Sequence, residues 1–150
     1  MSKRDITPYI PSNDEKKEGL ELHVYEEVVV FVECYKRLKN GIKEKNNLRI
    51  THESFLLHAR NLYEFLSGDL TEKDDILAVH FIKETIPISG FPKTEINKQL
   101  SHITYSRRNP TDLLEDSSKG IDEVYNKIKL GINIFRAKIG KSSYKDLPTL

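Results

Sequence analysis

The chain has 150 residues, of which 37% are hydrophobic and 31% charged, and 24 basic side chains against 23 acidic ones give a formal net charge of +1. This length predicts one domain with a core of its own, and the longest apolar run, residues 28–32, is far shorter than the roughly 20 residues that cross a bilayer. The near-zero net charge does not favour a long basic track for nucleic acid, because phosphate neutralisation supplies most of the affinity of such proteins. With no apolar signal region after Met1 and a lone cysteine, Cys34, the pattern is typical of a cytoplasmic protein without a disulfide framework.

Composition shifts divide the chain into three parts. Pro8, Pro11 and the charged residues that follow predict an extended, flexible N-terminal arm over residues 1–18. A single helical domain is expected over residues 19–140, and residues 141–150 are expected to form a tail.

Two long helices are predicted in the first half of the domain. Apolar residues at three- and four-residue spacing indicate a helix from about Leu20 to Lys39, which Gly41 ends. A second helix is expected from an N-cap at Thr51 to Gly68. It is apolar nearly all round, which favours a central place in the fold or an oligomer interface.

In the second half of the domain, the sequence predicts a short helix and two longer ones. A capping-box pattern precedes the short helix, expected over about Asp74–Lys83. The third main helix begins after Pro92 and reaches about Arg107, and the fourth spans about Ser118–Ile139, with residues 112–116 as a preliminary turn. Four amphipathic helices joined by moderate loops predict an all-α protein, a four-helix antiparallel bundle with one or two short extra helices.

Arg107 and His102 are candidate site residues on the third main helix. Arg107 continues an apolar stripe, so it either extends to solvent at the helix end or binds a carboxylate, phosphate or carbonyl group inside. A guanidinium fork suits the oxygens of an anion. His102 lies off that stripe between Gln99 and Ser106, where an imidazole serves either in acid–base chemistry or as a hydrogen-bonded structural residue.

A second polar group lies on the second helix. His58 and Asn61 share one face at i, i+3 spacing, whereas Arg60 projects to another side. These residues form either part of a site or a polar layer that sets the register of the helices. No histidine spacing typical of a metal site and no nucleotide-binding glycine motif occurs, so we expect neither metal nor cofactor.

Two segments, residues 55–65 and 96–107, resemble a group of small uncharacterised bacterial all-helical proteins whose architecture is similar to the HEPN superfamily of nucleic-acid-associated bundles. The resemblance covers about the middle third of the chain and implies a helical bundle, a homodimer, and RNA or a nucleotide-like anion as ligand. Many active HEPN proteins are metal-independent ribonucleases with an arginine, four to six residues and then a histidine on one helix. The matching positions after Arg60 carry Phe65, Leu66 and Ser67 instead.

The leading hypothesis is a HEPN-like protein that binds or processes RNA as a metal-independent endoribonuclease. In it, His102 or His58 deprotonates a 2′-hydroxyl, and Arg60 and Arg107 stabilise the phosphate. The alternative is a non-enzymatic helical interaction module, antitoxin-like or a regulatory partner, whose polar cluster is structural. A third hypothesis is a small-molecule pocket between the helices. No membrane partner is expected.

Overall fold

The structure is a computed structural model, which describes residues 9–69, 74–101, 110–140 and 144–150, with the backbone alone at residues 101 and 110–119. Within these ranges every regular element is a helix. The predicted all-α class is therefore confirmed. No helix in the described ranges is both long and apolar enough to cross a membrane.

The first rod of the fold is longer than predicted. It joins α1 (Asn13–Glu18), the π-helical turn η1 (Gly19–Val24) and α2 (Tyr25–Asn40) without a break. A capping box starts it, because the Ser12 hydroxyl accepts from the Glu15 amide while the Glu15 carboxylate accepts from the Ser12 amide. The predicted arm over residues 1–18 is therefore wrong for residues 13–18, which are helical.

The second long helix, α3 (Lys45–Ser67), begins well before the predicted N-cap at Thr51. The Glu44 carboxylate caps it by accepting from the amides of Asn46, at 2.9 Å, and Asn47, at 2.7 Å. Its end was predicted correctly: Gly68, with φ 72°, closes it in the left-handed conformation.

Three further helices complete the fold. α4 (Val79–Ile82) is much shorter than the predicted helix over residues 74–83, and α5 (Lys93–Ser101) begins as predicted after Pro92. The expected extension of α5 to Arg107 lies outside the described residues. α6 (Pro110–Ile139) begins before the predicted Ser118 and absorbs the turn expected over residues 112–116.

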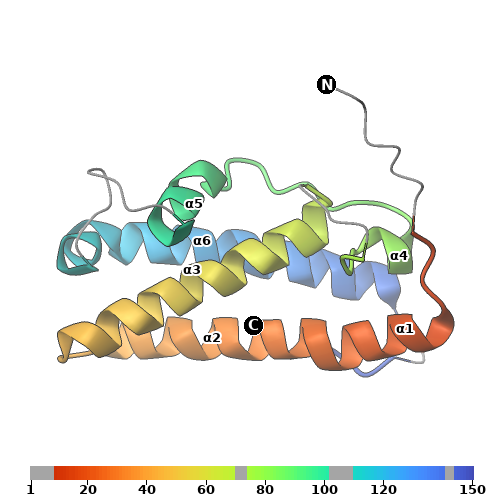
Figure 1. Ribbon diagram of the computed structural model, residues 1–150, viewed down its shortest axis with the longest axis horizontal. Coiled ribbons are helices and arrows are strands. Elements are labelled where there is room, and N and C mark those ends of the chain that lie inside the picture. The colour runs from red at the N-terminus through yellow and green to blue at the C-terminus, as the bar shows by residue number, and fades with distance from the viewer. Residues whose placement is uncertain (1–8, 70–73, 102–109, 141–143) are drawn as a thin grey trace.

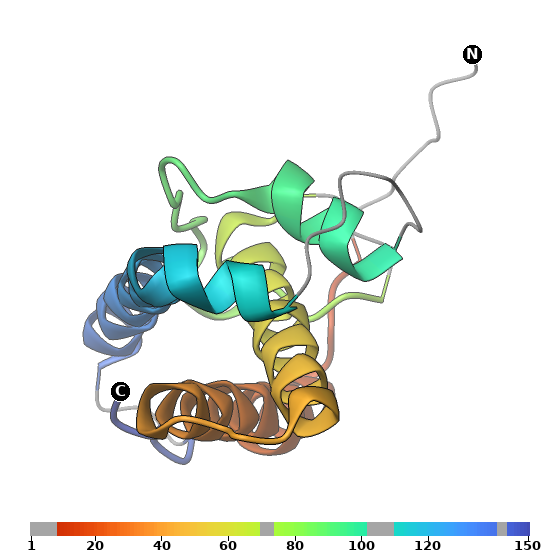
Figure 2. The same cartoon turned by 90° about the vertical axis from the view of Figure 1, so that its left-hand side faces the viewer.

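α3 is the central helix, as its nearly all-round apolar surface predicted. It packs against α2, α5 and α6, and the short loop of residues 41–44 makes α2 and α3 antiparallel neighbours (Figure 1). α6 runs in the same direction as α3, because the connection after Gly68 carries the chain back along the molecule before α6 starts (Figures 1 and 2). The order thus differs from the expected antiparallel bundle, and the short α5 stands beside α3 in place of a fourth long helix.

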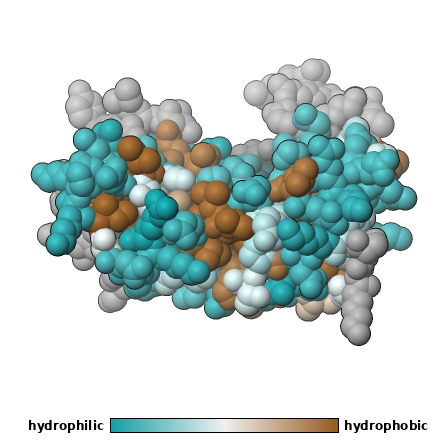
Figure 3. Space-filling view, turned by 90° about the horizontal axis from the view of Figure 1, so that it is seen from below, coloured by the Kyte–Doolittle hydropathy of each residue, from teal (hydrophilic) through white to brown (hydrophobic). Residues whose placement is uncertain are grey.

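An aromatic stack ties the three long helices together. Phe31 of α2 is fully buried, with its ring centroid 5.0 Å from that of Phe55 in α3 and 5.5 Å from that of Tyr125 in α6. Tyr35, one turn further along α2, stacks on Tyr125 at 3.7 Å. This stack fixes the rotation of α2 relative to α3, and so decides which polar residues of the two helices meet. On the face that Figure 3 shows, by contrast, apolar side chains form separate patches among hydrophilic ones.

The end of the chain packs against its beginning, so the predicted tail over residues 141–150 is wrong for the described residues 144–150. Leu147 is only 5% exposed, and Tyr144 meets the Phe81 ring edge-on at 5.6 Å. The backbone amide of Lys145 donates to Glu21 at 2.9 Å, and its ammonium group lies 4.1 Å from the centroid of the Tyr25 ring. Tyr144 and Leu147, which stand among polar residues in the sequence, thus hold residues 144–150 against the helices.

Candidate functional site

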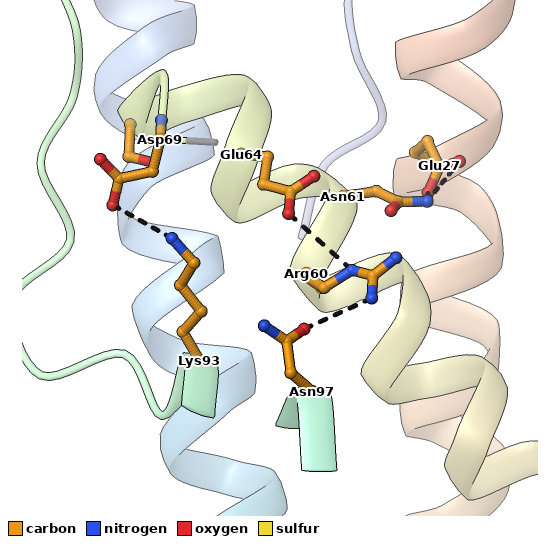
Figure 4. Close-up of polar contacts among 8 residues, drawn as sticks. Glu27, Arg60, Asn61, Glu64, Asp69, Lys93 and Asn97 are labelled. Atoms are coloured by element: carbon orange, nitrogen blue, oxygen red, sulfur yellow. Dashed lines mark hydrogen bonds and ion pairs between the residues drawn. The ribbon is translucent and has the colours of Figure 1, made fainter. Parts of the chain in front are cut away.

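The site residues predicted on α3 face two different helices. His58 is hydrogen-bonded to Glu27 of α2. Asn61 is bonded to the same residue, whereas Arg60 contacts Asn97 of α5 (Figure 4). Since successive helical residues are turned by about 100°, this confirms the predicted separation of Arg60 from the other two. α3 therefore carries polar residues on two of its sides, His58 and Asn61 towards α2 and Arg60 towards α5, and we call them, with their partners, the two ends of a polar strip.

The first end is a carboxylate–imidazole pair between α2 and α3. Glu27 Oε2 lies 2.6 Å from His58 Nδ1, and the same carboxylate accepts from Asn61 Nδ2 at 3.2 Å through each oxygen. An ionised carboxylate only accepts hydrogen bonds, so this contact places a proton on Nδ1 and leaves Nε2 of the neutral ring as an acceptor. The side chains of His58 and Glu27 are 20% and 30% exposed, so solvent reaches both.

Glu27 was not among the site residues predicted from the sequence. The only sign of its place was its position one turn before Phe31, on the edge of the apolar face of α2. Periodicity puts such a residue at the border of a core, but it does not identify the residue on the facing helix. That partner depends on how the two helices are rotated and in register.

The second end of the strip is Arg60, which its neighbours hold loosely. Arg60 Nη1 donates to Asn97 Oδ1 at 3.4 Å, and Arg60 Nε lies 3.9 Å from Glu64 Oε1, beyond hydrogen-bond distance. Nε is buried without a hydrogen-bond partner among the described residues. Burial raises the pKa of Glu64. The positive charge of Arg60 partly offsets this rise, and the negative charge of Asp75 adds to it. This guanidinium is thus poorly satisfied among the described residues, and a better acceptor would bind it more tightly.

Lys93 of α5 places a second cation on this side of α3, near the C-terminal end of the helix. Lys93 Nζ lies 3.6 Å from Asp69 Oδ2 and 5.6 Å from the centroid of the Tyr63 ring. The Tyr63 hydroxyl donates to the same Asp69 oxygen at 2.6 Å, which lowers the pKa of Asp69 and raises that of Tyr63. Phe91 stacks flat on Tyr63, with ring centroids 4.3 Å apart.

The other two predicted site residues, His102 and Arg107, lie outside the described residues. Of the remaining histidines, His52 is buried and His23 exposed. Cys34 is 7% exposed and donates to Ser54 Oγ at 3.5 Å, so its thiol is buried. Within the described part of the chain, no group of three or more His, Cys, Asp or Glu side chains is placed to hold a metal ion.

Comparison of the chain with family models, curated proteins and solved structures finds no match. Function is therefore inferred from what the polar strip can do chemically. An imidazole oriented at Nδ1 by a carboxylate can exchange a proton through Nε2, and a poorly satisfied guanidinium can bind an anion.

Proposed function

We propose that this chain is a HEPN-like helical protein that binds RNA and cleaves it by metal-independent acid–base chemistry, with His58 as the base. The hydrogen bond between Glu27 and His58 is the observation that carries the proposal, since it orients the ring and leaves Nε2 to accept a proton. The partial exposure of both side chains supports it, because a substrate has to reach that atom.

In the proposed reaction, His58 Nε2 takes the proton of a ribose 2′-hydroxyl. The 2′-oxygen then attacks the adjacent phosphorus and the bond to the 5′-oxygen breaks, leaving a 2′,3′-cyclic phosphate and a free 5′-hydroxyl. The leaving oxygen regains the proton from the imidazolium, which the Glu27 carboxylate stabilises in between. Arg60, on the neighbouring side of α3, is expected to hold a phosphate of the bound strand.

A cleavage assay on His58→Ala tests the proposal. With a short single-stranded RNA at low salt and with a chelator present, we expect the rate to fall by about 10²–10⁴-fold, the usual contribution of a positioned acid–base group. His23→Ala is the matched control, because His23 is an exposed histidine on η1; it should cleave like the wild type. The proposal fails if His58→Ala keeps wild-type activity, or if the wild-type chain neither binds nor cuts RNA at low salt, where such contacts are strongest.

A second candidate is a non-enzymatic interaction module, and the pairing of charges along the strip favours it. Glu27 faces His58, Glu64 faces Arg60 and Asp69 faces Lys93. Under this reading Arg60→Ala lowers the melting temperature or weakens a homodimer, which sedimentation over a range of concentrations measures. Under the ribonuclease reading, the same variant lowers RNA affinity by more than any loss of stability explains.

A further inference from the structure

Two cations and two aromatic rings lie together where α3 meets α5. Arg60 and Tyr63 share one face of α3 at i, i+3 spacing. Lys93 and Asn97 share one face of α5 at i, i+4 spacing, and both lie near Arg60 (Figure 4). Phe91, just before α5, completes the group by stacking on Tyr63. We call these five residues the α3–α5 surface.

Both cations of this surface are weakly engaged. The contacts of Arg60 and Lys93 with oxygen atoms of the described residues range from 3.4 to 3.9 Å, whereas the Tyr63–Asp69 hydrogen bond is 2.6 Å long. Charge-assisted bonds to phosphate are typically about 2.7–2.9 Å, so a phosphate would bind either cation more closely than its present neighbours do.

The aromatic pair supplies a flat apolar platform. Tyr63 is 9% exposed, whereas Phe91 is only half-buried. The two rings are parallel within 6°, so one face of each ring is covered by the other, while part of the Phe91 side chain remains exposed. Nucleobases stack on such surfaces when they are unpaired, whereas bases within a duplex already stack on one another.

We infer that the α3–α5 surface binds single-stranded RNA, with phosphates on Arg60 and Lys93 and a base against Phe91. The identity of the strand as RNA rests on the proposed function. His58 precedes Tyr63 by five residues and faces α2, so a strand bound on this surface would cross over α3 to reach the cleavage site. Asn97 is placed to meet a polar edge of the bound nucleotide through its amide.

Fluorescence anisotropy with one labelled sequence tests the inference in three forms: single-stranded RNA, single-stranded DNA and duplex RNA. The single-stranded DNA lacks the 2′-hydroxyl and cannot be cut. We expect the two single strands to bind the intact chain alike and the duplex to bind at least about tenfold more weakly, as loss of one stacked base predicts. Stacking and phosphate contacts do not distinguish ribose from deoxyribose.

Variants assign the binding to this surface. Phe91→Leu, which keeps an apolar side chain but removes the ring, should weaken single-strand binding about tenfold, and Phe91→Tyr should retain it. Lys93→Ala should weaken binding and lower the dependence of log affinity on log salt by about 0.7, the amount for one phosphate of a single strand. Lys138→Ala is the matched control, because it removes a lysine of α6 that is paired with Glu84. It should change neither the affinity for the single strand nor its dependence on salt.

The outcomes separate this inference from the proposed function. Equal affinity for duplex and single strand, or wild-type affinity in both Phe91→Leu and Lys93→Ala, overturns the inference whether or not RNA is cut. Tight single-strand binding without His58-dependent cleavage leaves the inference standing and overturns the catalytic proposal. If none of the three nucleic acids binds at low salt, both are wrong.

Discussion

Removing the Glu27 carboxylate should destabilise the packing of α2 on α3. Glu27→Ala deletes the common acceptor of His58 and Asn61 and leaves both side chains without their partner on α2. A hydrogen bond to a charged group contributes about 1.5–3 kcal/mol. The three contacts share one carboxylate that is 30% exposed, so water replaces part of the loss and we expect about 2 kcal/mol. For a chain of this length that lowers the melting temperature by about 4–8 °C.

Urea unfolding of the wild type, Glu27→Ala, His58→Ala and the double variant measures this directly. The cycle should give a coupling of about 1 kcal/mol between Glu27 and His58, because the double variant loses their contact only once. Glu26→Ala is the matched control, since Glu26 is the exposed neighbour on the same helix. A Glu27→Ala variant as stable as Glu26→Ala, with no measurable coupling, would refute the idea that this carboxylate orients His58.

Two further predictions concern the core. Phe31→Ala should lower the free energy of unfolding by about 3–5 kcal/mol, since it leaves a cavity between Phe55 and Tyr125; a loss below about 1 kcal/mol in urea titrations would contradict the central stack. Burial lowers the pKa of His52, an effect that Glu53 partly offsets, so below about pH 6.5 the unfolded chain takes up a proton there that the folded chain does not. The free energy of unfolding of His52→Leu, measured in urea relative to that of the wild type, should therefore rise as the pH falls from 7 to 5. A difference that does not change with pH would count against this.

The sequence predicted the fold class and the face of each polar residue on α3 because both follow from helical periodicity. Arg60 and His58 point to different helices for the same geometric reason that makes Phe55, Ala59 and Leu62 a buried stripe. Positions that depend only on the local repeat of about 3.6 residues are thus accessible without a structure.

Helix starts and long-range partners were harder to predict. Glu44 caps α3 with its carboxylate, although Thr51 belongs to a residue type that caps more often. The pairing of Glu27 with His58 depends on the rotation that the aromatic stack imposes, and Leu147 is an isolated apolar residue with no periodic neighbours to mark it as buried. Each of these features is decided by tertiary contacts that a local pattern does not contain.

The contact between the two ends of the chain has a consequence for synthesis on the ribosome. Glu21 receives its hydrogen bond from Lys145, 124 residues later, and Leu20 and Leu147 line the same cavity of about 230 Å³. Leu20 is made early, whereas the other residues that line this cavity, from Phe135 to Leu147, are made more than 100 residues later. While translation continues, the side of the cavity that Leu20 forms is open to the nascent chain's surroundings, so this end of the molecule is where we expect a chaperone to bind during synthesis.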